Sequence, residues 1–193
     1  LATLEDPDEF VAQVKDHDKK IFQLFGKHPV VFRNPELIYD DDISAMVQNM
    51  GFKGVITEGA KHILGWKSPN YVYSSPVAPK LKLLLKNSKL SDDISFRFSN
   101  PDWASYPLTA DKYIDWIASL PEEEQLVNLF MNYETFGEMQ PRESGIFEFM
   151  KALPRFAAEK GIEFFTPSEV ISKMKSVGEM PVMHPISWAD EAR

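Results

Sequence analysis

The sequence predicts an α/β fold built on a parallel sheet or barrel, and three observations lead to this prediction. Short apolar runs at 29–34, 54–57 and 80–86 have the composition and length of buried parallel strands. Apolar residues at helical spacing precede two of these runs, over 6–25 and 43–50. A helix followed by a strand, twice in succession, is the repetition that produces parallel strands.

The ends of the first two helices carry recognisable signals. Asp6-Pro7 is a cap followed by a helix-starting proline, and Gly26 is a plausible stop. The acidic triplet 40–42 precedes the second helix, which ends before Gly51. The triplet could instead indicate a Ca²⁺ or Mg²⁺ site, but it lacks the alternating oxygen ligands and glycine of a calcium loop. We therefore interpret it as helix capping.

The remaining elements follow from the same rules. Pro154 should kink or divide the long helix that contains it, because proline removes a backbone donor. The other expected elements are a strand at 126–131, a segment 94–98 capped by Ser91-Asp92-Asp93, helices at 109–120, 145–161 and 167–174, a strand at 162–165 and an extended stretch at 181–186.

Composition excludes several functional classes. The 193-residue chain carries a formal net charge of −8, which argues against a nucleic-acid or anionic-membrane partner. It contains no cysteine, so disulfides and thiolate chemistry are excluded. Its 4 histidines include no helical pair at ligand spacing, so we expect no metal and no cofactor. We expect no membrane helix and no signal peptide, and hence a cytoplasmic location.

The first candidate site residue is Glu36. Pro35 should end the strand before it, which places Glu36 just past the carboxyl end, where ligands bind in parallel α/β folds. Arg33 and Tyr39 lie beside it in the sequence. The alternative is a glutamate in the first turn of the next helix, where acids are favoured.

A second apolar run ends in a similar way. Residues 126–131 lead into Asn132 and Glu134, which would project to the same side of a strand. Two strands that each end in a carboxylate are the arrangement that a glycosidase needs.

Three further candidates follow the strand at 54–57. Glu58 and His62 would face the same edge as Glu36, and Trp66 lies in a loop rich in Gly, Pro and Asn. Glu58 could bind a substrate hydroxyl or support Glu36, or be a buried structural residue. Trp66 could stack on a sugar, because exposed aromatic rings suit that task, or belong to a small satellite core. Arg97 is a further candidate for pairing with a carboxylate at this edge, with a surface position as its alternative.

Several motifs together resemble the α-amylases of glycoside hydrolase family 57. They are Val31-Phe32-Arg33-Asn34-Pro35-Glu36-Leu37-Ile38-Tyr39, Thr57-Glu58-Gly59-Ala60, His62-Ile63-Leu64-Gly65-Trp66-Lys67-Ser68-Pro69-Asn70, Tyr133-Glu134-Thr135-Phe136-Gly137-Glu138 and Ser187-Trp188-Ala189-Asp190. The resemblance runs from Thr3 to the C-terminus. It implies an incomplete (β/α)7 barrel and cleavage of α-glucans with retention, by a glutamate nucleophile and an aspartate acid/base.

Carried over by residue, the resemblance assigns the nucleophile to Glu36 and the acid/base position to Asn132. Pro35 replaces the threonine of the family pattern, and Asn132 replaces the aspartate. An amide cannot protonate a leaving oxygen, and general acid catalysis contributes about 10²–10⁴-fold. Three explanations remain open: a homologue that has lost activity, an engineered substitution, or a replacement role for Glu134. A non-catalytic carbohydrate-binding homologue is the alternative function.

The resemblance also bears on domain organisation. It implies that residues 1–193 are the central part of a single (β/α)7 catalytic domain, with the family's first strand and its C-terminal helical region outside the chain. The expected partners are an α-glucan oligosaccharide or polysaccharide and the remaining segments of the same enzyme. A barrel that lacks strands has an open edge, which another segment should cover.

Overall fold

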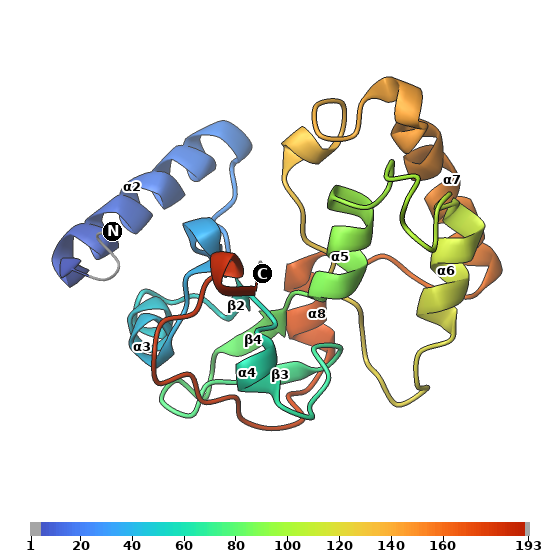
Figure 1. Ribbon diagram of the computed structural model, residues 1–193. Coiled ribbons are helices and arrows are strands. Elements are labelled where there is room, and N and C mark those ends of the chain that lie inside the picture. The colour runs from blue at the N-terminus through green and yellow to red at the C-terminus, as the bar shows by residue number, and fades with distance from the viewer. Residues whose placement is uncertain (1–4, 192–193) are drawn as a thin grey trace. The chain divides into compact units, whose positions relative to one another are not determined.

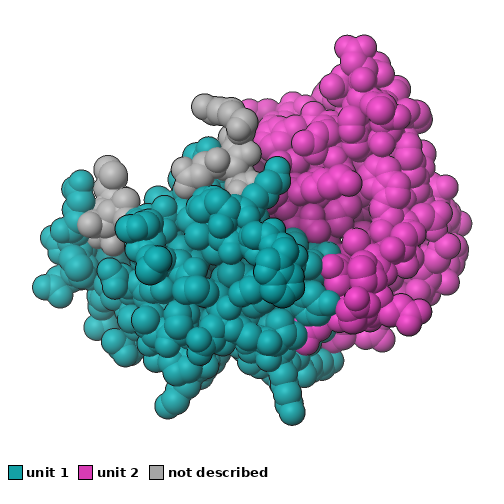
Figure 2. All heavy atoms as spheres, turned by 60° about the horizontal axis from the view of Figure 1, so that its bottom comes forward, with its two compact units in different colours: residues 1–85, 166–193 teal, residues 86–165 magenta. Residues whose placement is uncertain are grey.

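A computed structural model describes residues 5–191, without the side chains of residues 190 and 191 (Figure 1). The chain forms two compact units, coloured separately in Figure 2. Unit 1 comprises residues 1–85 and 166–193, and unit 2 comprises residues 86–165. The expected sites on Glu36 and on Asn132 therefore belong to different units.

Unit 1 is built on a four-stranded sheet in the order β1-β2-β4-β3. β1 (Val31–Arg33), β2 (Gly54–Thr57) and β4 (Lys82–Leu85) are parallel, which confirms the α/β class and all three strands on which it was predicted. β3 (Val72–Ser74) pairs antiparallel with β4 and was not predicted. β1 is the edge strand on the side opposite β3.

Two helices of unit 1 begin where their sequence signals placed them. α2 (Pro7–Phe25) is capped by the Asp6 side chain and ends at Gly26, whose φ of 67° is left-handed. α3 (Asp41–Asn49) is capped by Asp40, which accepts a hydrogen bond from the Ile43 amide at 2.8 Å. The capping interpretation of the acidic triplet is thus confirmed. The short α4 (Lys61–Leu64), which was not predicted, and α8 (Pro167–Lys173), which begins at its predicted position, also belong to unit 1.

The core of unit 1 joins both sequence segments of the unit. Phe10 of α2, Val47 of α3 and Leu83 of β4 are buried together with Met180 and Ile186 from the C-terminal stretch. Two hydrogen bonds between Tyr39 and Ile186 form an isolated antiparallel bridge. The expected extended stretch at 181–186 is therefore tied to the residues that follow Glu36.

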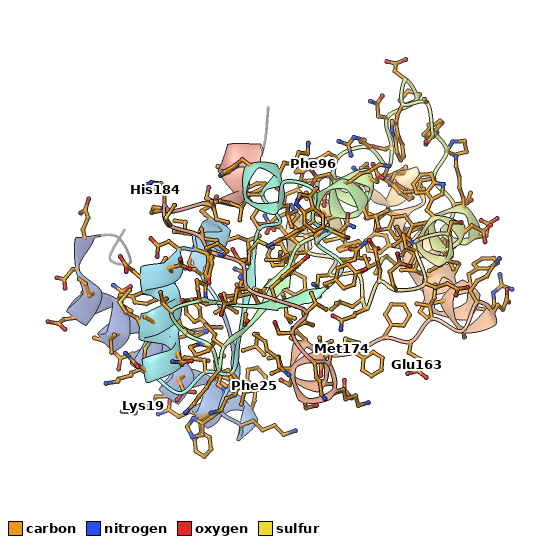
Figure 3. The ribbon with its side chains drawn as sticks, turned by 90° about the horizontal axis from the view of Figure 1, so that it is seen from below. Lys19, Phe25, Phe96, Glu163, Met174 and His184 are labelled. Atoms are coloured by element: carbon orange, nitrogen blue, oxygen red, sulfur yellow. The ribbon has the colours of Figure 1, made fainter. Side chains whose placement is uncertain are left out.

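The C-terminal end of α2 carries exposed apolar side chains. Phe22, Leu24 and Phe25 are 46%, 60% and 69% exposed, and Phe25 is labelled in Figure 3. No described helix is both long enough and apolar enough to span a membrane.

Unit 2 is helical. α5 (Ser88–Ser95), α6 (Ala110–Ala118) and α7 (Ile146–Glu159) pack around Tyr113 and Phe149, whose rings meet edge to face at 5.7 Å. Pro154 lies inside α7 and does not divide it, so the expectation that this proline splits the helix is wrong. Pro154 and Met150 are exposed, so the Met150 carbonyl that loses its partner lies on the outer face of the helix.

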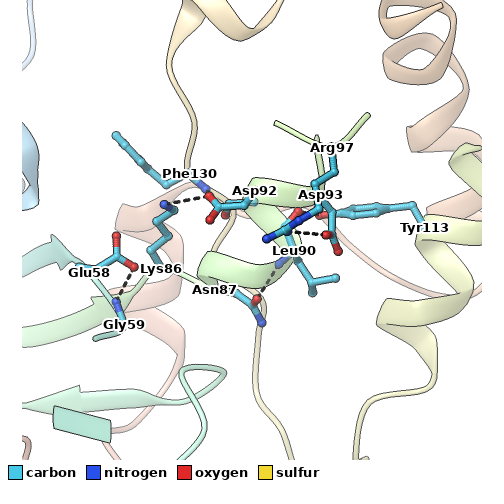
Figure 4. Close-up of polar contacts among 11 residues, drawn as sticks. Glu58, Gly59, Lys86, Asn87, Leu90, Asp92, Asp93, Arg97, Tyr113 and Phe130 are labelled. Carbon is cyan, nitrogen blue, oxygen red and sulfur yellow. Dashed lines mark hydrogen bonds and ion pairs between the residues drawn. The ribbon is translucent and has the colours of Figure 1, made fainter. Parts of the chain in front are cut away.

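Three predicted elements of unit 2 are wrong. Residues 126–131 and 162–165 form no strand, and the segment predicted at 94–98 belongs partly to α5, which begins earlier with Asn87 as its cap. The Asn87 side chain accepts from the Leu90 amide at 3.0 Å (Figure 4). Val127, Leu129 and Met131, the alternate apolar residues of this run, pack on the helical core of unit 2 without a neighbouring strand.

Candidate functional site

Glu36 lies at the carboxyl end of β1 in a strained turn. The 3₁₀ turn η1 (Pro35–Leu37) follows the strand directly, as the proline predicted. Glu36 and Leu37 have φ values of 57° and 52°, and both are non-glycine residues in the left-handed region. Such a conformation costs about 1–2 kcal/mol per residue, and it persists in proteins mainly at functional sites. The Glu36 side chain is exposed.

Surrounding contacts hold this turn in place. The Leu37 side chain is buried, and its amide donates to the Asn34 carbonyl at 3.1 Å. The buried Asn34 side chain donates to the Ile38 carbonyl at 3.2 Å. Tyr39 then enters the bridge with Ile186. The turn is thus fixed on both sides of Glu36, and the left-handed backbone directs the carboxylate outward.

The Glu36 carboxylate also has a partner from the C-terminal stretch. The indole N–H of Trp188, in the 3₁₀ turn η4 (Trp188–Glu191), donates a hydrogen bond to Glu36 Oε2. Sequence reasoning gave Trp188 no role, because nothing in the sequence shows that residues so far apart meet. The only available signal was the motif Ser187-Trp188-Ala189-Asp190 itself.

A groove of about 630 Å³ runs along α2 and β1 next to this turn. Its apolar walls come from Phe10, Val14, Val31, Phe32, Ile38 and Phe52, and its polar lining includes Gln13, His17, Asp18, Arg33 and Asn34. Arg33 lines this groove and is exposed at the end of β1. It precedes Glu36 by three residues in the sequence.

Glu58 follows β2 and is 1% exposed. Its Oε1 accepts a hydrogen bond from the Gly59 amide at 3.1 Å (Figure 4). A side chain this buried agrees with the structural alternative for Glu58. A role in supporting the edge of the sheet stays a prediction.

His62 and Trp66 are both exposed in unit 1. His62 lies in α4, and Trp66 follows Gly65, the residue that ends this helix. Trp66 is 92% exposed, so it does not belong to a satellite core. A ring in this position is free to stack on a ligand.

In unit 2, Asn132 precedes the 3₁₀ turn η2 (Tyr133–Thr135), which contains Glu134. Both side chains are exposed. Because residues 133–135 form a turn, the prediction that Asn132 and Glu134 project to one side of a strand is wrong. Tyr133 between them is 95% exposed and was not predicted as a site residue.

Two other charged groups have structural partners. Arg97 pairs at 2.7 Å with Asp93, four residues earlier, so the expected pairing with a carboxylate at the sheet edge is wrong (Figure 4). Burial raises the pKa of Asp41, while a hydrogen bond from the Val182 amide acts in the opposite direction. Among the side chains that the structure describes, no three from His, Asp or Glu cluster as metal ligands would.

A parallel sheet with an exposed carboxylate in a strained turn at a strand end is the arrangement of an α/β protein with its site at the carboxyl edge. The family model of glycosyl hydrolase family 57 matches residues 1–183. The chain belongs to this family.

Two similar proteins refine the comparison. A protein of Methanocaldococcus jannaschii named "Putative alpha-amylase" is 48% identical over 192 residues, which cover 98% of this chain and 40% of that protein. The chain thus spans two fifths of the length of this curated relative. The crystal structure of 4-alpha-glucanotransferase from Thermococcus litoralis has the same fold, with a TM-score of 0.70 and 16% identity over 96% of this chain and 28% of that one.

Proposed function

We propose that this chain carries the nucleophile-bearing part of a retaining α-glucan hydrolase, with Glu36 as the nucleophile. The observation that carries the proposal is the strained turn that presents Glu36 at the carboxyl end of a parallel strand. Family membership and the name of the curated relative support an α-glucan as substrate.

The proposed chemistry has two steps. A Glu36 oxygen bonds to the anomeric carbon as the glycosidic bond breaks, and the departing oxygen takes a proton from an acid. Water then cleaves the glycosyl–Glu36 ester, and the same second group accepts the proton from this water. Asn132 occupies the position of that acid/base by resemblance and cannot supply the proton. The first step should therefore be slow unless the leaving group needs no proton.

The proposal places the other candidates around the sugar. Trp66 offers its exposed ring for stacking, and Arg33 and His62 are exposed side chains that could contact hydroxyl groups. Glu58 would act from a buried position, and Glu134 is the exposed carboxylate nearest in sequence to Asn132.

We further propose that residues 1–193 are the central part of an incomplete (β/α)7 barrel and that other segments of the enzyme cover its open side. β1 is an edge strand among the described residues, which gives a further strand a place to pair. The apolar groove along α2 and the exposed Phe22, Leu24 and Phe25 support such a cover.

A non-catalytic carbohydrate-binding homologue is the second candidate, and Asn132 is the observation that favours it. Asn132→Asp separates the two. A disabled hydrolase should gain starch hydrolysis by about 10²–10⁴-fold, measured as reducing ends released by the protein as its gene encodes it. Asn100→Asp, which adds the same charge to an exposed position of unit 2, is the matched control. No gain from Asn132→Asp would support the binding protein.

The dependence on Glu36 is tested in the same assay. Glu36→Gln in the Asn132→Asp background should abolish the gained hydrolysis, because the amide is a much weaker nucleophile than the carboxylate. Hydrolysis that survives this double substitution would remove Glu36 from the proposal.

A further inference from the structure

The hydrogen bond between Trp188 and Glu36 is a contact that the proposed function does not use. The donor is the indole N–H of Trp188 and the acceptor is Oε2 of Glu36, both in unit 1. Trp188 is half-buried, whereas the Glu36 carboxylate is exposed. The indole thus comes from a different segment of the chain to meet the one carboxylate in the strained turn.

The backbone holds Trp188 at this position. Tyr39, three residues after Glu36, and Ile186, two residues before Trp188, exchange two backbone hydrogen bonds of 3.0 and 2.9 Å. Further along, the Asp41 amide donates to the Val182 carbonyl at 2.9 Å, and the Val182 amide donates to Asp41 Oδ2 at 3.1 Å. These hydrogen bonds therefore hold residues 39–41 and 182–186 together, close in sequence to both Glu36 and Trp188.

The chemistry of the pair suits the orientation of a nucleophile. The indole nitrogen is a donor only, so it accepts no proton from the site. A hydrogen bond to a carboxylate is stronger than one between neutral groups. It holds one oxygen of Glu36, and within the described residues the other oxygen accepts no hydrogen bond. One oxygen is fixed and the other stays available for attack.

We propose that Trp188 is a positioning residue that orients the Glu36 carboxylate for attack on the anomeric carbon, an inference that rests on the proposed function. The side chain of glutamate rotates about three bonds, and the turn fixes only its backbone. Without the indole donor, the carboxylate samples orientations that do not attack. A misplacement of about 1 Å can cost on the order of 10²-fold in rate, so a loss of roughly ten- to a hundredfold is expected.

A spectroscopic experiment tests the contact without any need for activity. The 4 tryptophans of the chain give 4 indole N–H resonances in a ¹⁵N-labelled sample, and Trp188→Phe identifies one by its loss. Glu36→Gln replaces the charged acceptor by a neutral one of the same shape. We expect it to shift the Trp188 resonance more than those of the other three. An unchanged Trp188 resonance would overturn the inference.

A kinetic experiment tests the consequence. α-Maltotriosyl fluoride needs no acid for its leaving group, so the rate of the first-turnover fluoride burst reports attack by Glu36 despite Asn132. Trp188→Phe should lower the maximal burst rate roughly ten- to a hundredfold and leave the substrate concentration that gives half of this rate unchanged. Met183→Ala, at a side chain that is 81% exposed in the same stretch, is the control and should behave as the unsubstituted chain.

The outcomes separate the two proposals. A lower maximal burst rate, with unchanged half-saturating substrate concentration and unchanged thermal stability, supports a positioning role. Equal rates for Trp188→Phe and the unsubstituted chain overturn that role while the proposed function stands. Absence of fluoride release from the unsubstituted chain contradicts the proposed function and the positioning role with it. If Glu36→Gln still shifted the Trp188 resonance, the hydrogen bond would exist but would have a structural role only.

Discussion

Glu36 combines an exposed carboxylate with a backbone that glycine would adopt more easily. Its φ of 57° places a side chain in the left-handed region, and buried Leu37 continues this conformation. The contacts of Asn34 and Tyr39 on either side hold the turn against its strain. The turn therefore lowers the stability of the chain and fixes the direction of one carboxylate. Strained backbone of this kind clusters at functional sites.

A pair of substitutions measures that strain. Glu36→Gly and Glu36→Ala both remove the carboxylate, but only alanine has to carry a Cβ at positive φ. We expect the glycine variant to be more stable than the alanine variant by about 1 kcal/mol in urea unfolding. Equal stability of the two variants would mean that residue 36 has an ordinary backbone conformation in solution.

At the residue scale, sequence reasoning found the position of Glu36 but not its conformation. Pro35 marks the end of the strand, so the carboxylate just after it was visible. Left-handed glutamate and leucine have no sequence signal, because the surrounding fold imposes them. The contact from Trp188 was invisible for a similar reason, since it depends on the tertiary bridge between Tyr39 and Ile186.

At the scale of elements, α8 supports the sheet at its second strand. A Cβ at Gly54 would lie 2.4 Å from Ile171 Cδ1 and 3.3 Å from the Lys82 carbonyl oxygen. A methyl group at position 54 would therefore force the Ile171 side chain to move, although the φ of Gly54 is not positive. This contact locates α8 against the strand that precedes Glu58.

Gly54→Ala should consequently destabilise the chain by about 1–3 kcal/mol through overpacking. Ile171→Val removes the Cδ1 atom that is closest to the new methyl group and costs about 0.5–1.5 kcal/mol alone. We expect the double variant to be more stable than the sum of the single effects predicts, as measured by chemical denaturation. Simple additivity would show that the helix and strand do not pack this closely.

The first turn of α8 makes the free energy of unfolding depend on pH. Glu169 Oε2 accepts from the Thr166 amide at 2.8 Å, and this hydrogen bond is the main cause that lowers the pKa of Glu169 from its ordinary value of 4.5. Because the folded-state pKa is the lower one, the stabilisation is complete above about pH 4.5 and disappears as the pH falls through the folded-state pKa.

Glu169→Gln should therefore lower the melting temperature at neutral pH, and the difference from the unsubstituted chain should shrink as the pH drops below 4.5. Ser172→Ala, at an exposed position of the same helix, serves as a comparison whose effect has no such pH dependence. A constant difference for Glu169→Gln over this range would argue against the capping box.

Sequence patterns predicted elements best where capping or strand-breaking signals accompany them. The helices α2, α3, α6 and α8 and the parallel strands were found in this way. The prediction of strands at 126–131 and 162–165 is wrong because short apolar segments can pack on helices as well as in a sheet. β3 was missed because its 3 residues lie in a loop-like composition.

At the scale of the molecule, the division into two units could not be read from the sequence. Unit 1 is discontinuous, since residues 166–193 join 1–85 across the insertion of unit 2. No change in composition marks either boundary. The two catalytic positions of the proposal, Glu36 and residue 132, come one from each unit.

The formation of a covalent intermediate on Glu36 tests the central claim most directly. With α-maltotriosyl fluoride, attack by Glu36 needs no acid, but Asn132 cannot activate the water that cleaves the ester. We expect a burst of about one fluoride per chain and a maltotriosyl group on the peptide that contains Glu36, detected by mass spectrometry after digestion. Absence of the burst, or a burst that persists in Glu36→Gln, would contradict the assignment of Glu36 as the nucleophile.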